Sequence, residues 1–130
     1  MPLLRKLSAV LLLSTFFTAP LMAQPIQPFS TAALKAAQAA GKSVLVDAYA
    51  SWCPICRKQA PTIDAMAQDP AFDKLVILRL DYDNQSAEKR QLGIVQQSTL
   101  IAFDGNKETG RLVGVTDPAQ IKTLAQSALH

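Results

Sequence analysis

Apolar and polar residues follow one another along this chain in a pattern typical of alternating strands and helices. Two nearly continuous apolar runs, SVLVDAYA at 43–50 and KLVILRLDYD at 74–83, predict strands that are covered on both faces, as parallel strands between helices are. Between them, from Pro54 to about Gln68, apolar residues recur at helical spacing. This predicts a helix whose buried stripe consists of Cys56, Ala60, Ile63 and Ala67. Pro61 lies inside this helix and should kink it.

Shorter patterns predict further helices on either side of these elements. In STAALKAAQAAGK, strong helix formers follow Ser30 and stop at Gly41, whereas the preceding QPIQPF is typical of an extended, mobile lead-in. SAEKRQLG predicts a short polar helix that ends at Gly93. TDPAQIKTLAQSAL predicts a last helix, capped by Thr116 or Asp117, with an inner stripe of Ile121, Leu124, Ala125 and Ala128.

A hairpin precedes that last helix. TLIAF at 99–103 and TGRLVGV at 109–115 are two short strand-like runs with an Asp-Gly turn at Asp104 and Gly105 between them. The expected element order is therefore α-β-α-β-α-β-β-α. Strand–helix–strand units followed by a hairpin predict an α/β fold, with a mixed central sheet and helices on both faces.

The amino-terminal residues have the layout of a secretory signal peptide. Arg5 and Lys6 precede an apolar stretch that begins at Leu7, and we expect cleavage after Ala23. We therefore expect a signal peptide at 1–23, a single domain at 24–130 and a periplasmic location. An uncleaved membrane anchor is the alternative, because Leu21 is larger than the small residue usually found at its position.

Charge then narrows the range of partners. Without the signal peptide, eleven basic residues face ten acidic ones, so the net charge is about +1. No block of like charge and no alternation of basic with aromatic residues is present, so a nucleic-acid partner is not expected. Nothing in the sequence suggests a dimerisation domain, and we expect a monomer.

Both cysteines lie in YASWCPICRKQAP, as Cys53 and Cys56. A structural zinc site needs four ligands, and His130 is the only histidine that could join them, so we expect no metal. A disulfide between these two would close a minimal loop and stabilise little. A redox pair needs the two sulfurs close together where a strand meets a helix, which is where the pattern places them. The redox interpretation is therefore favoured, with the Cys53–Cys56 disulfide as the redox group and no other cofactor.

The same junction suggests a role for each residue. Pro54 suits the first helical position, so the Cys53 sulfur faces the free N–H groups of the helix start, which stabilise a thiolate. Cys53 then attacks a disulfide, and Cys56, on the buried stripe, resolves the mixed disulfide. Asp47 is the candidate acceptor for the Cys56 proton, with a solvent-facing strand end as the alternative. Trp52 is either a core aromatic or a rim residue that shields the sulfurs.

These residues resemble the thioredoxin family. VLVDAYASWCPICRKQAP, LGIVQQSTLIAF and the late Gly114 carry the resemblance, which extends over essentially all of residues 28–129. It implies the thioredoxin fold, with Cys53 as nucleophile, Cys56 as resolving cysteine and Asp47 as proton acceptor. Arg79 takes the position where family members often carry a lysine near that aspartate.

One departure from the family concerns the substrate-binding loop. Where the family has a cis-proline followed by threonine, this chain has Ser98 and Thr99. A cis bond before a non-proline residue costs about 2.5–4 kcal/mol, so the sequence alone leaves the Gln97–Ser98 bond open. The N–H and hydroxyl of Ser98 could hydrogen-bond the Cys53 thiolate or alter the lifetime of a mixed disulfide. The alternative is a tolerated loop variant.

The direction of electron flow is indicated only weakly. Pro54 and Ile55, between the cysteines, include no histidine to stabilise the thiolate, which favours a reductase or exchanger of protein disulfides over a strong oxidant. Electrons would then come from a membrane electron carrier. The alternative is a module that holds Cu(I) or a partner protein through the two thiols, with little turnover. Against it, no methionine is near in sequence except Met66, which is expected to be core.

Overall fold

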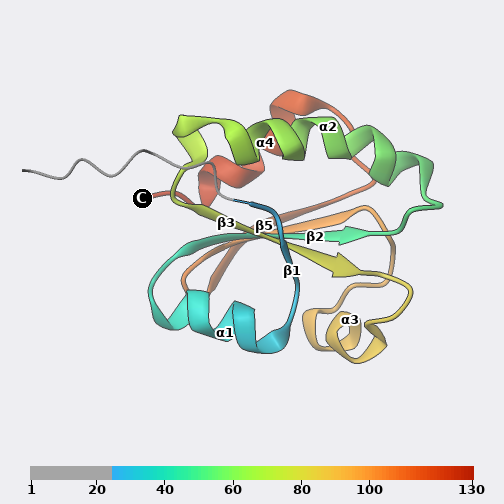
Figure 1. The fold of residues 1–130 in the computed structure, drawn as a ribbon, viewed down its shortest axis with the longest axis horizontal. Coiled ribbons are helices and arrows are strands. Elements are labelled where there is room, and N and C mark those ends of the chain that lie inside the picture. Colours follow the sequence, from blue (N-terminus) through green and yellow to red (C-terminus); the bar gives the residue numbers. More distant parts are fainter. Residues whose placement is uncertain (1–24) are drawn as a thin grey trace, which may run out of the picture.

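A five-stranded mixed sheet forms the centre of the structure, a computed structural model that describes residues 25–130 (Figure 1). The predicted signal peptide at 1–23 lies outside the described residues. The strand order is β1-β3-β2-β4-β5, with β1 and β2 parallel to β3, and β4 antiparallel to β2 and β5. The strands are β1 (Gln27–Pro28), β2 (Ser43–Tyr49), β3 (Leu75–Asp81), β4 (Thr99–Asp104) and β5 (Lys107–Val113).

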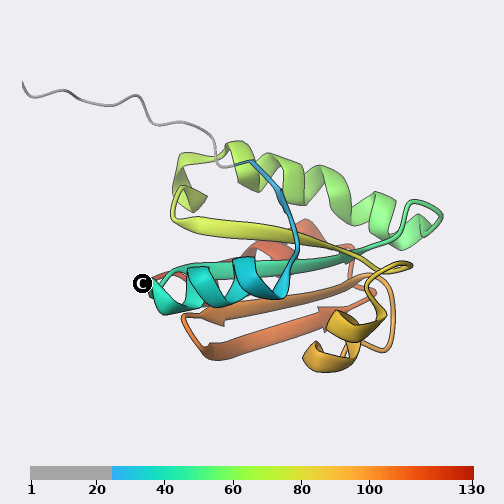
Figure 2. The same ribbon diagram turned by 60° about the horizontal axis from the view of Figure 1, so that its bottom comes forward.

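Helices cover both faces of this sheet. They are α1 (Thr31–Ala39), α2 (Pro54–Gln68), α3 (Ser86–Leu92) and α4 (Pro118–Ser127), with a 3-10 turn, η1, at Pro70–Phe72. Figure 1 shows α2 and α4 on one face and α1 and α3 on the other, and Figure 2 shows the twisted sheet between them. The sequence-based α/β fold with a mixed central sheet is confirmed. Within residues 25–130, no helix is long and apolar enough to cross a membrane.

Alternation along the central strand divides its side chains between two hydrophobic clusters. Leu45 packs under α2 and α4, whereas Val44 and Val46 pack on the side of α1, and all three are fully buried. Asp47 has the same parity as Leu45 and therefore points to the α2 face, where it is 1% exposed. The strand thus delivers one carboxyl group into the buried layer beneath α2.

The predicted helix boundaries agree well with the structure because local caps determine them. Ser30 accepts a hydrogen bond from Ala33 N–H at the start of α1, and Asp117 accepts one from Ala119 N–H at the start of α4. Gly93 ends α3 with a φ of 64°, a left-handed conformation that glycine adopts without strain. The inner stripe predicted for α4 is buried throughout.

Two expectations about the strands were wrong in detail. The lead-in predicted to be mobile forms β1, which pairs with β3 at Gln27 and Pro28, and Phe29 behind it is 4% exposed. Pro28 can sit there because the strand is at the sheet edge. The hairpin turn consists of Gly105 and Asn106 and not of Asp104 and Gly105, because Asp104 is still part of β4 and pairs with Lys107.

The buried stripe of α2 also differs from the prediction. Ala60 is only partly buried, whereas the polar Gln59 is fully buried. Gln59 is three residues after Cys56, so the two side chains share the inner face of the helix.

Candidate active site

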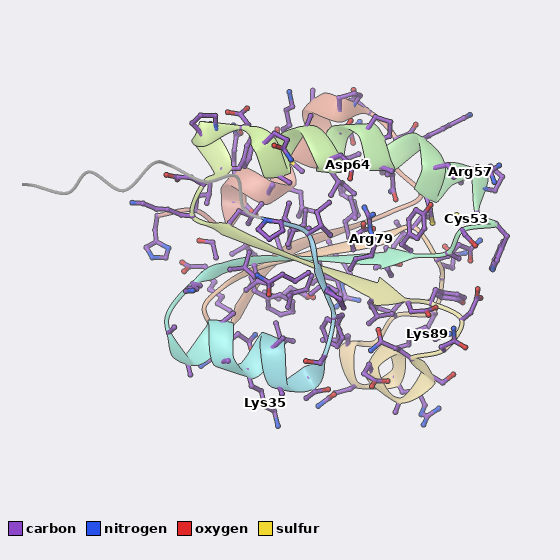
Figure 3. All side chains as sticks on the ribbon, viewed as in Figure 1. Lys35, Cys53, Arg57, Asp64, Arg79 and Lys89 are labelled. Carbon is purple, nitrogen blue, oxygen red and sulfur yellow. The ribbon has the colours of Figure 1, made fainter. Side chains whose placement is uncertain are left out.

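The two cysteines lie at the point where β2 leads into α2. Figure 3 shows Cys53 there, at one end of the sheet. Cys53 is the N-cap of α2, with extended backbone, and Pro54 is the first helical residue. The Cys53 sulfur accepts a hydrogen bond from the backbone N–H of Cys56 over 3.1 Å. It thus takes the place of the side-chain oxygen that usually caps a helix, where the amide dipoles favour negative charge.

Cys56 lies one turn into α2 and is 1% exposed. Its sulfur is 3.8 Å from the backbone carbonyl oxygen of Ala48 on β2. Burial, together with a hydrogen bond to Cys53, raises the pKa of Cys56 to about 11, against an opposing effect of the backbone groups of Ala50 and Ser98. Both cysteines are free, and the raised pKa of Cys56 favours its thiol form.

The surface around the pair is more exposed than the sulfurs. Cys53 is only 1% exposed and packs in a small cluster with Ala50 and Cys56, whereas Trp52 is 53% exposed and Ile55 39%. The Trp52 indole N–H donates to both carboxylate oxygens of Asp83, over 3.0 and 2.9 Å. Trp52 is therefore a rim residue, and an incoming partner would meet it and Ile55 before the sulfur.

Asp47 is paired with Arg79 beneath α2. Arg79 Nε donates to Oδ2 of Asp47 over 2.8 Å, while Oδ1 has no hydrogen-bond partner among the described residues. Burial raises the pKa of Asp47, and the guanidinium of Arg79 opposes this rise by charge and hydrogen bonding. The structure therefore contains a carboxyl group in the layer between β2 and α2 that favours its neutral form more than an exposed aspartate does.

Arg79 is itself held from two sides. Its guanidinium lies over the ring of Tyr49, 4.7 Å from the centroid, and its Nη2 is 3.7 Å from Oδ1 of Asp64 on α2. Figure 3 shows Arg79 between the sheet and the helix that carries Asp64. A cavity of about 340 Å³, lined by Tyr49, Arg79 and Asp81 among others, lies beside it. Arg79 therefore links the buried carboxyl group of Asp47 with the solvent-facing side.

Ser98 lies against the same site, and the Gln97–Ser98 peptide bond is trans. Residues 25–130 contain no cis peptide bond, and Ser98 has a φ of 60°, which is strained for a residue other than glycine. Its N–H donates to Ala48 O over 3.0 Å, and its hydroxyl donates to the carbonyl of Gln97. Neither group bonds Cys53, so the direct thiolate contact considered from the sequence does not occur in this structure.

Thr99 next to it begins β4 and is 2% exposed. Its hydroxyl donates to Gln96 O over 2.8 Å. The Thr99 hydroxyl therefore bonds the carbonyl group of Gln96, and the Ser98 hydroxyl bonds that of Gln97.

Gln59 is the residue that the sequence-based reasoning missed. Its Nε2 donates to the carbonyl of Ser98 over 3.2 Å and to that of Val115 over 2.9 Å, and the side chain is fully buried. The signal was present in the sequence, because Gln59 has helical spacing from Cys56 on the inner face. A polar residue at a core position indicates hydrogen-bond partners that the sequence cannot name.

In the described part of the chain, no three or more histidine, cysteine, aspartate or glutamate side chains are grouped so that they could hold a metal ion. Met66, which could have offered a soft ligand, is 1% exposed within the apolar cluster under α2 and α4.

A mixed sheet with a Cys-x-x-Cys pair at the start of α2 defines a class of thiol–disulfide oxidoreductases, and comparisons with known proteins agree. The family described as Thioredoxin matches residues 27–127. Thioredoxin from Alicyclobacillus acidocaldarius is 34% identical over 89 residues, which is 68% of this chain and 84% of the relative. Thioredoxin from Chlamydia muridarum is 37% identical over 81 residues, 62% of this chain and 78% of the relative.

Solved structures show the same relationship. The crystal structure of Trxlp from Edwardsiella tarda superimposes with a TM-score of 0.75 at 37% identity, covering 78% of this chain and 98% of that one. Thioredoxin from Malassezia sympodialis superimposes with a TM-score of 0.71 at 27% identity, covering 80% and 93%. The chain belongs to the thioredoxin family, and its activity is that of a thiol–disulfide oxidoreductase.

Proposed function

We propose that this protein exchanges disulfides with protein substrates in the periplasm, with Cys53 as the attacking and Cys56 as the resolving cysteine. The observation that carries this proposal is the Cys53 sulfur at the N-cap of α2, 3.1 Å from the Cys56 N–H. A thiolate formed there would accept that N–H and face the positive end of the helix dipole. Cys56, whose pKa is about 11, stays a thiol until the first step has occurred.

The reaction proceeds in two exchange steps. The Cys53 thiolate attacks one sulfur of a substrate disulfide, forming a mixed disulfide and releasing the other substrate sulfur as a thiolate. Cys56 then gives its proton to Asp47 and attacks the Cys53 sulfur. This forms the Cys53–Cys56 disulfide and releases the second substrate thiolate. The substrate has gained two electrons from the pair, and the proton held by Asp47 is available to the departing thiol.

Asp47 suits this role for a physical reason. Burial raises the pKa of this carboxyl group toward neutral pH, so the group can accept a proton and lose it again. The cavity that Arg79 lines brings solvent close to the Asp47–Arg79 pair. Trp52, Pro54 and Ile55 form the supporting rim, and the Ser98–Thr99 segment is the loop proposed to meet the substrate.

The predicted signal peptide supports a proposal for location and electron supply. We infer that residues 1–23 direct the chain to the periplasm and are removed there. The reductant would then be a membrane electron carrier that supplies two electrons and two protons to the oxidised pair. Because Ile55 offers no positive charge to the Cys53 thiolate, the favoured role is reductase or exchanger, acting without a bound cofactor and as a monomer.

Reduction of insulin disulfides with dithiothreitol as the electron source tests the catalytic assignment. Cys53→Ser should abolish turnover, and reduced Cys56→Ser, mixed with insulin in the absence of dithiothreitol, should accumulate a mixed disulfide through Cys53. Ser51→Ala, beside the pair but outside it, is the matched control and should keep the wild-type rate. Full activity of Cys53→Ser would overturn the proposal.

The reduction potential, measured by equilibration with glutathione, tests the direction. A value near about −270 mV fits a reductant, whereas one near about −120 mV fits an oxidant and would overturn the proposed direction. Ile55→His should move the potential toward the oxidising value, because a protonated imidazole near Cys53 stabilises the thiolate.

A further inference from the structure

Gln59 joins three parts of the chain through one nitrogen atom. From α2, its Nε2 donates to Ser98 O in the loop 93–98, which we call the Ser98 loop, and to Val115 O in the segment between β5 and α4. Gly114 N–H donates to the same Ser98 carbonyl over 3.1 Å, which closes the connection between the two loops. The Ser98 carbonyl therefore receives two internal hydrogen bonds.

Only one orientation of the Gln59 side-chain amide is compatible with its hydrogen-bond partners. Both of its neighbours are carbonyl oxygens, so the NH2 group must face them. Its Oε1 is buried and has no hydrogen-bond partner among the described residues. A buried acceptor without a partner destabilises the fold, and an apolar side chain of similar volume would pack there without that cost. The two donated hydrogen bonds are thus the feature that distinguishes glutamine from an apolar residue at this position.

These hydrogen bonds hold a strained residue. A left-handed conformation is unfavourable for any residue with a Cβ, by about 1–2 kcal/mol, and Ser98 adopts it with a φ of 60°. Such a conformation persists only where its surroundings impose it. Ser98 N–H is at the same time bonded to Ala48 O, the carbonyl that lies 3.8 Å from the Cys56 sulfur. The Ser98 loop is therefore held near the sulfurs from two sides, by Gln59 on α2 and by Ala48 O on β2.

We propose that Gln59 is a positioning residue, which holds the Ser98 loop in its left-handed conformation beside Cys53 and Cys56 and so governs the binding of protein disulfides. The inference rests on the proposed function, in which this loop meets the substrate. Gln59 acts through Ser98 and not on the reacting sulfurs, so its effect should depend on the size of the substrate.

Gln59→Met tests the proposal, because methionine has a similar shape and cannot donate. The KM for insulin should rise about tenfold, which is the order expected when the two buried hydrogen bonds of Gln59 are lost. The rate with 5,5′-dithiobis(2-nitrobenzoic acid), a small disulfide that needs no loop, should stay within about twofold of the wild type. The reduction potential should be unchanged within experimental error. Thr62→Val removes a buried polar group from the same helix and is the control; neither its KM nor its small-disulfide rate should change. An unchanged KM in folded Gln59→Met would overturn the proposal.

Gln59→Glu adds a readout that a purely structural role would not give. The introduced carboxyl group can donate one hydrogen bond while protonated and none when ionised. The KM for insulin should therefore be near the wild-type value at low pH and rise with pH more steeply than in the wild type. A profile parallel to the wild type would contradict the proposal, and this variant also serves if Gln59→Met does not fold.

Amide hydrogen exchange separates this inference from the proposed function. Exchange at Gly114 N–H, which bonds Ser98 O, should accelerate about tenfold in Gln59→Met and stay unchanged in Thr62→Val. If the wild type fails to reduce insulin, the proposed function falls while the exchange result still decides whether Gln59 holds the loop. If insulin is reduced and exchange at Gly114 does not change, only the inference about Gln59 is overturned.

Discussion

Asp47 and Arg79 are register partners on the parallel strands β2 and β3, and Arg79 Nε donates to Asp47 Oδ2 over 2.8 Å. The Asp47 side chain is 1% exposed and that of Arg79 28%, so the pair reaches from the layer under α2 toward solvent. Since the guanidinium is always charged, it lowers the electrostatic cost of ionising Asp47 at any physiological pH. Burial thus raises the pKa of Asp47, and pairing with Arg79 opposes this rise.

Replacing Arg79 by methionine should destabilise the protein mainly where Asp47 is ionised. Loss of the partner leaves a buried carboxylate uncompensated, which costs about 3 kcal/mol at high pH. At low pH the carboxyl group is neutral, and the loss should be smaller. Guanidinium denaturation at pH 4 and pH 9 measures the difference, with Arg79→Lys, which keeps the charge, as control. An equal loss at both pH values would show that the loss does not arise from ionised Asp47.

Asp47→Asn should change the pH dependence of stability in a defined direction. Because the pKa of Asp47 is raised in the folded protein, the folded state binds more protons than the unfolded state in the window above the unfolded value of 3.8. The free energy of unfolding of the wild type should therefore fall, relative to Asp47→Asn, as pH rises from that value to the raised pKa. Denaturation curves from pH 3 to 9 measure this, and a difference of the opposite sign would contradict the raised pKa.

Resolution by Cys56 should become strongly pH-dependent without Asp47. With a pKa of about 11, only about one Cys56 in ten thousand is a thiolate at pH 7. In Asp47→Asn, the decay of the mixed disulfide should accelerate about tenfold per pH unit between about pH 7 and 10. The wild type should show a flatter profile. Stopped-flow fluorescence of a labelled peptide follows the decay.

The first step is the internal control for this experiment. Attack by Cys53, measured in a Cys56→Ser background, should change less than about twofold when Asp47 is replaced by asparagine. If both steps slow equally, Asp47 is not the proton acceptor of Cys56.

Substitutions of Ser98 should separate its backbone conformation from its hydroxyl group. Ser98→Pro should cost about 3 kcal/mol unless the loop rearranges, because proline cannot adopt a φ of 60° and lacks the N–H that bonds Ala48 O. Ser98→Gly should alter the free energy of unfolding by less than about 1 kcal/mol, since glycine adopts this conformation without strain. Thermal denaturation compares the two. Equal stability of all three proteins would show that the left-handed conformation is not required.

The lifetime of a trapped mixed disulfide gives the functional counterpart. Ser98→Pro should change it, because the loop beside the sulfurs can no longer keep its present backbone. Ser98→Gly should leave it within about twofold of the wild type. An unchanged lifetime in the proline variant would make Ser98 a tolerated variation of the loop.

Much of the fold could be read from the sequence because the deciding forces are local. The apolar run through Val44–Val46, the proline after Cys53 and the glycine after α3 each act on neighbouring residues, so element type and helix ends followed from pattern and caps. Placement of Cys53 and Cys56 at a strand–helix junction followed in the same way. By contrast, β1 was missed because two residues carry no periodic signal, and only pairing with β3 makes them a strand.

The sequence by itself determined the order of the elements from α1 onward, the place of the cysteine pair at the start of α2 and the presence of a carboxyl group in a buried strand. Only the tertiary structure decided that Arg79 lies opposite Asp47 and that Gln59 bonds Ser98 and Val115. It also decided that the Gln97–Ser98 peptide bond is trans and that Ser98 has a left-handed backbone. Each of these depends on residues far apart in the chain. Strand register and loop docking bring them together, and neither leaves a periodic pattern in the sequence.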